Sequence, residues 1–442
     1  MAVQNLSSLL ASWLLSAMLL ATLSFSASAL DPIVTQEPMQ GVPPARESQV
    51  TMQNYREYPM NKWAFRNAGA PLNIVMIPRA GTIFPLPGPS KPALGQRLFT
   101  TAQGQQQSFD DLFESNYADG VVVMKGNRLV YEKYFHGFHA DAQHIWFSMS
   151  KSMASSAFGL LVAKDKVDLN ASPADYIPEL KGSGFERVTI QHVLDHATAI
   201  DFKETYTDFT SDFALKYAPA MNMGYLPGAR DAQPSNTKIL GVHDFLAHYI
   251  KPDLSIEPGS NFDYNSTNAD LLGWLIARIS GQPVEEFLQK NIWAKLGAEH
   301  DAYIAVDRAF MPVMTGGVNT TLRDAARFGM MIRDRGRFNG QQVIPKKWVD
   351  ASLEITPTLR ANMAKNPNYG EEPWTAYHNM WWILDETIGE YCAVGIHGQI
   401  IYINRKADTV MTWFSSQPVA GAARNLNFRA KLQAARELAR TL

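Results

Sequence analysis

Ser148 and Lys151, in the segment SMSK, have the residue types and the spacing of a nucleophile and its base. A serine hydroxyl is a weak nucleophile until a neighbouring base takes its proton. Residues i and i+3 lie on one face of a helix, so a helix that begins at Ser148 brings the two side chains together. The helix dipole disfavours an ammonium at that end, which favours a neutral Lys151, and the Ser148 N–H can bind an oxyanion. The pattern therefore predicts acyl transfer through Ser148.

Tyr264 and two glycines of a later strand pair are candidates for the rest of this site. Tyr264 precedes a periodic apolar helix in FDYNSTNADLLGWLIARISG, and its hydroxyl can relay the proton to the leaving group. Gly395 and Gly398, in CAVGIHGQ, leave room for the backbone to approach a ligand closely. One N–H from such a strand edge can complete an oxyanion hole.

Two other patterns contain catalytic residue types, and both have a simpler interpretation. SNTK at residues 235–238 repeats the serine–lysine spacing, but it follows Pro234 in a polar stretch and precedes no helix of small residues. His192 and His196 in HVLDH have the i, i+4 spacing of zinc ligands, but Val193 stands where such motifs place glutamate and no third ligand is evident. We therefore predict no metal site and no cofactor.

The elements that must position these residues follow one another in the order strands, helices, strands. Two β-rich runs flank Gly126-Asn127, which is typical of a hairpin, and a helix of small and apolar residues begins at Ser148, a good N-cap residue. Residues 165–290 are mainly helical, residues 377–416 return to strands, and a helix ends the chain. This order predicts an α+β fold in which both ends of the chain build one sheet domain.

The predicted boundaries divide the chain into a signal peptide, an arm and a main domain. Residues 1–29 are interpreted as a signal peptide because an uncharged apolar run precedes ASA, a small-residue cleavage site, although no Lys or Arg precedes the run. Residues 30–100, rich in Pro and Gly, form an extended arm with little regular structure. The main domain is residues 101–442, with a sheet domain at about 101–160 and 290–442 and a helical domain at about 161–289.

The apolar run at the start of the chain predicts export. We expect a periplasmic or secreted protein with no membrane span after signal cleavage, and an uncleaved anchor is the alternative. The formal net charge is −2 and no long basic block occurs, which argues against a nucleic-acid partner. Cys392 is the only cysteine, so neither an internal disulfide nor a cysteine-rich metal cluster can form.

The segments around Ser148, Tyr264 and Gly395, in this order, resemble the serine β-lactamase and penicillin-binding-protein superfamily. VDLNASPADYIPEL, VTIQHVLDHATAI and the stretch that begins GGVNTTLRDAARFG are similar to its class C β-lactamase and esterase branch. The Pro-rich arm, DFKETYTDF and GIHGQ are most similar to 6-aminohexanoate-dimer hydrolases. The resemblance implies an antiparallel sheet flanked by helices with an inserted all-helical domain. It also implies an acyl-enzyme on Ser148, with Lys151 as general base and Tyr264 as proton relay.

Two departures from the family pattern bear on the substrate. Family members usually have Tyr-x-Asn, but Ser266 stands at the third position here and offers a hydroxyl in place of a carboxamide. The Lys-Thr-Gly strand motif is replaced by AVG, so Ala393 stands where a lysine helps to bind the substrate carboxylate of β-lactams. This loss argues against β-lactam and D-Ala-D-Ala substrates. The same alignment implies that the Ile396 N–H completes the oxyanion hole with that of Ser148.

The resemblance also implies a set of substrate-binding residues. Tyr206, in DFKETYTDF, matches the loop tyrosine that closes over the substrate amide in the dimer hydrolases. Trp382 is expected to line the pocket, and His397 lies just past the oxyanion position. The full set of substrate-binding candidates is Tyr206, Ser266, Trp382, Gly395 and His397.

Taken with the departures, the resemblance implies an exported serine hydrolase that cleaves a small ester or linear amide. Two alternatives stay open. One is a class C-type β-lactamase or D-alanyl-D-alanine peptidase, and the other is a catalytically silent binding module of the same fold. Neither the natural substrate nor the oligomeric state follows from these residues.

Overall fold

The computed structural model describes residues 37–100, 104–224, 226, 238–421 and 426–442. The chain divides into two units, residues 1–37 and Pro38–Leu442, and every helix and strand of the described chain lies in the second. The predicted signal peptide and the serine of the SNTK segment lie outside the described residues. Among the described residues, no helix combines the length and the apolar character needed to cross a bilayer.

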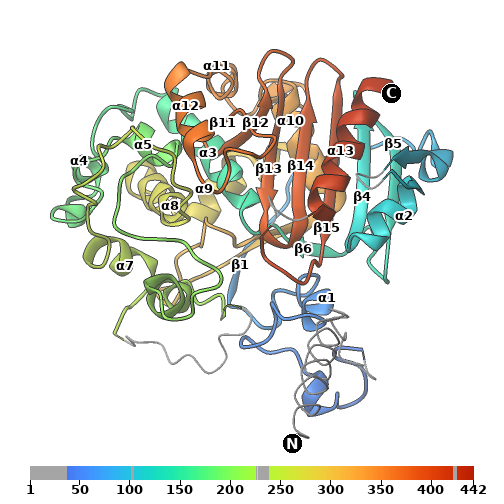
Figure 1. The fold of residues 1–442 in the computed structure, drawn as a ribbon, viewed down its shortest axis with the longest axis horizontal. Coiled ribbons are helices and arrows are strands. Elements are labelled where there is room, and N and C mark those ends of the chain that lie inside the picture. Colours follow the sequence, from blue (N-terminus) through green and yellow to red (C-terminus); the bar gives the residue numbers. More distant parts are fainter. Residues whose placement is uncertain (1–36, 101–103, 225, 227–237, 422–425) are drawn as a thin grey trace, which may run out of the picture. The chain divides into compact units, whose positions relative to one another are not determined.

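Seven antiparallel strands form the main sheet, and both ends of the chain contribute to it (Figure 1). The order across the sheet is β11-β12-β13-β14-β15-β4-β5, so the last strand in sequence, β15, pairs with β4, the first. This arrangement confirms the predicted α+β fold and the hairpin at Gly126. The strands are β4 (Ala118–Lys125), β5 (Arg128–Tyr134), β11 (Ala376–His378), β12 (Trp381–Asp385), β13 (Glu390–Gly395), β14 (Gln399–Asn404) and β15 (Thr409–Ser415).

A second sheet of four short strands joins the arm to the body. Its order is β1-β7-β8-β6, and β1 from the arm pairs antiparallel with β7, with Ile74 opposite Ala305. The expectation of little regular structure in the arm missed this strand. Two further pairs are β2 (Leu98–Thr100) with β3 (Gln106–Ser108) and β9 (Arg337–Phe338) with β10 (Gln341–Gln342). The four-stranded sheet consists of β1 (Ile74–Ile77), β6 (Gln143–Ile145), β7 (Ala302–Ala305) and β8 (Val318–Thr321).

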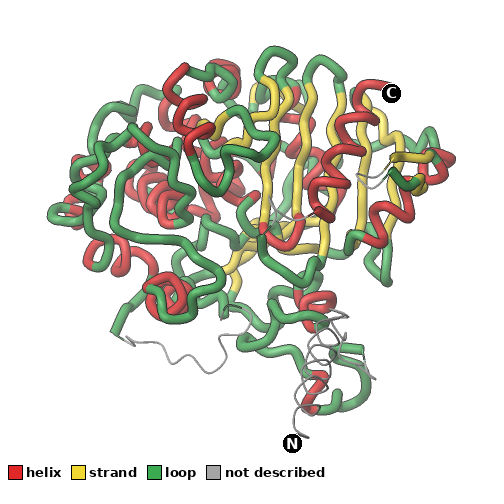
Figure 2. The backbone as a smooth tube through the Cα atoms, in the orientation of Figure 1, coloured by secondary structure: helices red, strands yellow, loops and turns green. Residues whose placement is uncertain are grey.

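Helices cover the main sheet (Figure 2). α10 packs against β4, β14 and β15, and α3 packs against β13 and β14. Between β6 and β7 the described chain forms helices and loops alone, as predicted for the helical segment, whose boundaries stay a prediction. The helices are α1 (Met60–Ala64), α2 (Phe109–Ser115), α3 (Met149–Val162), α4 (Pro173–Tyr176), α5 (Ile190–Leu194), α6 (Ala218–Ala220), α7 (Val242–His248), α8 (Thr267–Ser280), α9 (Val284–Asn291), α10 (Leu322–Arg333), α11 (Lys346–Ala351), α12 (Pro357–Lys365) and α13 (Leu426–Thr441).

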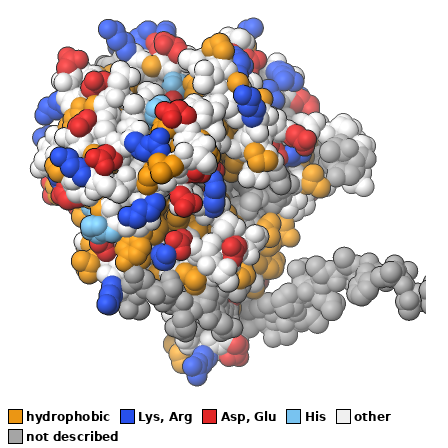
Figure 3. Space-filling view, turned by 60° about the vertical axis from the view of Figure 1, so that its left-hand side comes forward, with side chains coloured by type: hydrophobic (Ala, Val, Ile, Leu, Met, Phe, Trp, Pro, Cys, Tyr) orange, Lys and Arg blue, Asp and Glu red, His pale blue; other side chains and the backbone are white. Residues whose placement is uncertain are grey.

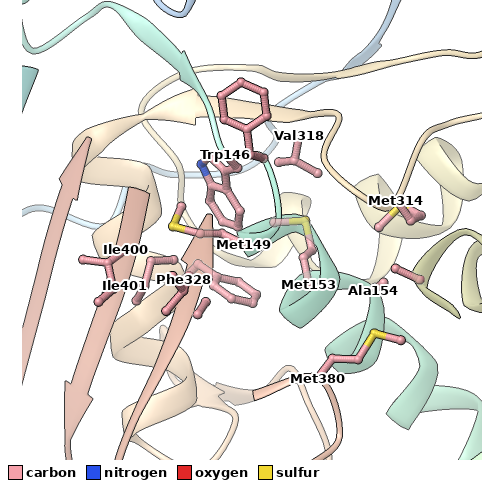
Figure 4. Packing of buried hydrophobic residues seen from close by; sticks show 14 of the residues in the cluster. Trp146, Met149, Met153, Ala154, Met314, Val318, Phe328, Met380, Ile400 and Ile401 are labelled. Atoms are coloured by element: carbon pink, nitrogen blue, oxygen red, sulfur yellow. The ribbon is translucent and has the colours of Figure 1, made fainter. Parts of the chain in front are cut away.

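α3 is the central helix, and apolar side chains pack against its first turns (Figure 4). Met149 and Met153 project from this turn into a cluster with Phe328 of α10 and Ile400 of β14. Just before the helix, Trp146 is fully buried and its Nε1–H donates to Thr320 Oγ1 at 2.8 Å. A helix buried all round cannot slide without disrupting the core, so the position of its N-terminus is fixed.

The surface carries no large region of one charge on the face shown in Figure 3. Positive and negative side chains are interspersed there with apolar and neutral ones. This pattern agrees with the formal net charge of −2 and offers no basic stripe for a nucleic-acid backbone on this face.

Candidate active site

Ser148 and Lys151 meet at the N-terminus of α3. Ser148 is the N-cap residue, but its hydroxyl makes no capping hydrogen bond and instead lies 2.8 Å from Lys151 Nζ. Lys151 Nζ also donates to the carbonyl of Thr315 at 3.0 Å, and the lysine side chain is almost fully buried. The Ser148 hydroxyl is thus directed toward the lysine and away from the backbone N–H groups that an N-cap serine usually serves.

Burial decides the protonation of Lys151. It lowers the pKa of the ammonium from its usual 10.5 to about 8, against the opposing effect of the Glu204 and Asp270 carboxylates. A buried ammonium loses its hydration, and this loss favours the neutral amine. Lys151 is therefore neutral much more often near neutral pH than an exposed lysine is, and a neutral amine has the lone pair that a base needs.

Tyr264 lies against the same lysine. The centroid of its ring is 5.1 Å from Lys151 Nζ. Burial raises the pKa of the Tyr264 hydroxyl well above 10, with smaller contributions from Tyr377 and Glu204, and a hydrogen bond with Ser148 opposes the rise. Tyr264 therefore stays protonated at any ordinary pH, which suits an O–H group that passes a proton on and excludes a standing tyrosinate.

A narrow cavity opens beside Ser148. Its volume is about 20 Å³, little more than the roughly 10–15 Å³ that one water molecule needs. Ser148, Ser266, Tyr206 and Ile396 all line it. The first N–H groups of a helix have no acceptor within the helix, and the Ile396 backbone follows directly on β13. The arrangement can hold a carbonyl oxygen between two backbone N–H groups next to a serine hydroxyl.

Tyr206 and Ser266 are connected through a residue that the sequence did not single out. The Tyr206 hydroxyl donates to one oxygen of Glu204, and the Ser266 N–H donates to the other at 2.6 Å. Glu204 thereby joins the loop segment DFKETYTDF to the N-terminus of α8. Its charge also acts on Lys151, so this carboxylate affects both the shape and the protonation of the site.

A family model described as Beta-lactamase matches residues 109–436, and these include every residue of the site described above. The chain belongs to the β-lactamase family. It is 31% identical over 378 residues to a 6-aminohexanoate-dimer hydrolase of Paenarthrobacter ureafaciens, across 85% of this chain and 90% of the relative. The β-lactamase family match and this relative make the protein a serine hydrolase, and both confirm the resemblance seen in its motifs.

Two solved structures show that the β-lactamase fold extends over most of the chain. One, described as a 6-aminohexanoate-dimer hydrolase from Bacillus anthracis, matches with a TM-score of 0.77 and 24% identity, over 90% of this chain and 98% of that one. The other is a penicillin-binding protein from Bacillus halodurans, with a TM-score of 0.53 and 16% identity, over 74% of this chain and 99% of that one. At these sequence identities, the structural similarity is evidence for the fold alone.

In this β-lactamase-family protein, Gly395 lets two parts of the backbone approach closely, and its predicted contact with substrate stays a prediction. A Cβ atom at Gly395 would lie 2.3 Å from the carbonyl oxygen of Trp146, so a side chain there would collide with backbone. The glycine is required because β13 ends directly against the segment that leads into α3. The close approach is therefore between two parts of the protein, and it fixes Ile396 relative to Ser148.

Two further predicted substrate-binding residues lie behind the cavity. His397 is fully buried between Phe65 and Phe147, its Nδ1–H donates to the Gln417 carbonyl at 2.7 Å, and burial lowers its pKa to about 3. Trp382 stacks on Tyr264 at a centroid distance of 5.4 Å. Neither residue is among those that line the cavity, so a direct contact with substrate stays a prediction for both.

Thr315 and Asp270 complete the support of the lysine, and motif reasoning missed both. The Thr315 N–H donates to Asp270 Oδ1 at 2.8 Å, and the Tyr217 hydroxyl donates to Asp270 Oδ2 at 2.5 Å. Burial raises the pKa of Asp270 to about 6. This chain of contacts fixes the Thr315 carbonyl that accepts from Lys151. Asp270 lies four residues after Ser266 on α8, a helical spacing that could have directed attention to it.

The two histidines of HVLDH are engaged with the backbone. His192 Nδ1 accepts from the Thr189 N–H at 3.2 Å, and His196 Nδ1 accepts from the Asn265 N–H at 2.9 Å.

A larger cavity of about 470 Å³ lies elsewhere, between residues 371–373 and α13. The described residues that line it include no serine, threonine, cysteine or lysine, so we place the active site at the smaller cavity beside Ser148.

Proposed function

We propose that this serine hydrolase cleaves an ester or a linear amide through an acyl-enzyme on Ser148, with Lys151 as general base and Tyr264 as proton relay. The observation that carries the proposal is the buried pair of Ser148 Oγ and Lys151 Nζ at 2.8 Å. A serine hydroxyl and an amine at this distance need no rearrangement for proton transfer.

In the first step the neutral amine of Lys151 accepts the proton of the Ser148 hydroxyl as Oγ attacks the substrate carbonyl. The carbonyl oxygen becomes an oxyanion, and the backbone N–H groups of Ser148 and Ile396 donate to it. Such donors are fixed before the reaction and stabilise the negative charge where it forms. The Thr315 carbonyl keeps Lys151 Nζ in place during the transfer.

In the second step the C–O or C–N bond of the substrate breaks, and the leaving group must gain a proton. The Tyr264 O–H gives its proton to the leaving oxygen or nitrogen and regains one from the Lys151 ammonium. A water molecule then attacks the acyl-enzyme by the reverse of this proton path, which releases the acid and restores the Ser148 hydroxyl. Because its pKa is raised, Tyr264 carries a proton at the start of each cycle.

The proposed substrate class follows from the cavity and from Ala393. In β13, Ala393 stands at the position where the family pattern has a lysine, and it is fully buried. This strand therefore offers no cation here. The side chains that line the cavity are mostly apolar, which suits the hydrocarbon chain of an ester or a linear amide. The relative named for hydrolysis of the 6-aminohexanoate dimer is consistent with this class.

A panel of three substrates tests the proposal: 4-nitrophenyl butyrate, the linear 6-aminohexanoate dimer and nitrocefin. We expect the ester to be cleaved with a higher kcat/KM than nitrocefin. Turnover of nitrocefin equal to or above that of the ester would favour the alternative, a class C-type β-lactamase. No turnover of any of the three would favour the binding module.

Export is also proposed. The apolar run and the ASA segment of residues 1–29 support it. N-terminal sequencing of the protein recovered from the periplasm or medium of a bacterial host should begin at Leu30, and a chain that keeps its first residues in the cytoplasm would contradict cleavage and export.

A further inference from the structure

Arg56, a residue of the arm, reaches the cavity beside Ser148. It is the one charged side chain among the described residues that line this cavity. Its neighbours there are mostly apolar: Phe147, Phe213, Met221, Met223 and Ile396. The cavity thus combines hydrocarbon walls, a serine hydroxyl and a single guanidinium.

The guanidinium of Arg56 is held in a fixed position. Its Nε–H donates to the Tyr55 hydroxyl at 2.8 Å, and that hydroxyl donates to the Met223 carbonyl at 2.6 Å. Its central carbon lies 5.4 Å from the ring centroid of Tyr55 and 5.7 Å from that of Phe147. Phe147 directly precedes Ser148, so this contact holds the guanidinium near the nucleophile.

This cation forms no ion pair with a carboxylate among the described residues. Arg56 is 5% exposed, and among the described residues no carboxylate lies within 4.0 Å of it. Its two terminal NH₂ groups make no hydrogen bond with any described residue. A buried charge without a partner is costly, and a ligand of the opposite charge would remove that cost.

We propose that Arg56 binds a carboxylate of the substrate, and that the preferred substrate is an ester or linear amide with an apolar chain that ends in a carboxylate. This proposal rests on the proposed function and specifies its substrate class. The two terminal NH₂ groups of a guanidinium match the two oxygens of a carboxylate, and the contacts with two aromatic rings restrict the movement of the fork. The arm would thereby supply the cation that Ala393 no longer provides, from a different part of the chain.

Two esters that differ only in the end of the acyl chain test this assignment. 4-Nitrophenyl hexanoate ends in a methyl group, and mono-4-nitrophenyl adipate has the same chain length and ends in a carboxylate. In the Arg56→Gln variant we expect kcat/KM for the adipate ester to fall about 10- to 100-fold and that for the hexanoate ester to stay within about threefold. A second pair of esters places the carboxylate on the leaving group: 3-carboxy-4-nitrophenyl butyrate is compared with 4-nitrophenyl butyrate.

Two matched variants serve as controls. Arg46→Gln removes an exposed charge from the same arm and should leave both esters unchanged. Arg56→Lys keeps the charge without the fork and should recover part of the lost activity on the carboxylate ester. Equal loss on charged and neutral esters would show that Arg56 only supports the fold of the site. No loss on any ester would show that the cation does not contact substrate.

A binding measurement separates this proposal from the proposed function. In the Ser148→Ala variant, which cannot turn over, calorimetry should show tighter binding of hexanoate than of hexanamide, and Arg56→Gln should abolish the difference. If no ester is hydrolysed but this difference is found, the hydrolase proposal fails and the carboxylate site stands. If the two ligands bind alike while the esters are hydrolysed, the carboxylate site fails and the hydrolase proposal stands.

Discussion

Ser148 Oγ and Lys151 Nζ lie 2.8 Å apart, and the lysine is 1% exposed. The same burial that excludes water from the pair lowers the pKa of the lysine to about 8. Position and protonation therefore have one cause, the packing of the first turn of α3 against the core. The properties expected of the enzyme follow from this relationship.

The rate should rise with pH. Below a pH of about 8 the Lys151 amine is protonated and cannot accept the serine proton, and above it the amine is neutral. We therefore expect kcat/KM for 4-nitrophenyl hexanoate to increase as pH rises and to level off above about 8, since this ratio reports ionisations of the free enzyme. Initial rates corrected for spontaneous hydrolysis measure it. A profile that falls over this interval would contradict a lysine base.

Glu204→Gln should move that profile to lower pH. The carboxylate of Glu204 raises the pKa of Lys151 against the effect of burial, so its removal lets the pKa fall further. The amide keeps one oxygen that can accept from the Ser266 N–H, so the shape of the loop should be retained. Glu257→Gln, at an exposed position, is the control and should leave the profile in place. A shift to higher pH in the Glu204 variant would contradict the conclusion that Glu204 raises the pKa of Lys151.

Lys151→Arg should be inactive although the positive charge is kept. A guanidinium stays protonated at any working pH and cannot accept the Ser148 proton. We expect a loss of about 10²- to 10⁴-fold or more in kcat, the usual contribution of a general base. Lys164→Arg, an exposed lysine just after α3, should keep full activity. A Lys151→Arg enzyme with a tenth of wild-type activity would exclude this role.

Tyr264→Phe should slow turnover without loosening the fold. The variant keeps the ring that stacks on Trp382 and removes only the hydroxyl. A loss of about 10²- to 10⁴-fold in kcat is expected for a proton relay, with an unchanged thermal midpoint. Tyr377→Phe, which removes a hydroxyl from the neighbouring ring at a centroid distance of 5.7 Å, is the control. Equal effects of the two substitutions would assign both hydroxyls to packing.

Local patterns predicted those parts of the fold and the site that depend on neighbours in sequence. The pairing of Ser148 with Lys151 depends on one helical turn, and the hairpin at Gly126 depends on a two-residue turn. The return to strands at residues 377–416 was also predicted, and β11 to β15 lie there. Each of these signals lies within a few residues, where propensity and periodicity apply.

Contacts between distant segments could not be predicted in this way. β1 pairs with β7 across about half of the chain, and both are four-residue strands without a clear alternation. Arg56 reaches the cavity from the arm, and nothing near it in sequence distinguishes it from an exposed arginine. The burial of His397, where the backbone φ is 60°, was likewise not evident from its motif. Burial of this kind depends on tertiary packing, which a local motif does not contain.

The central claim is that Ser148 is the nucleophile, and covalent labelling tests it most directly. The protein is treated with a fluorophosphonate probe and its intact mass and labelled peptide are determined. We expect one probe per chain, attached to Ser148, and loss of ester turnover on the order of 10⁶-fold in Ser148→Ala. Ser235→Ala, which removes the serine of the second Ser-x-x-Lys segment, should label and turn over like the wild type. A probe found on Ser235, or a folded wild-type protein that takes up none, would contradict the account.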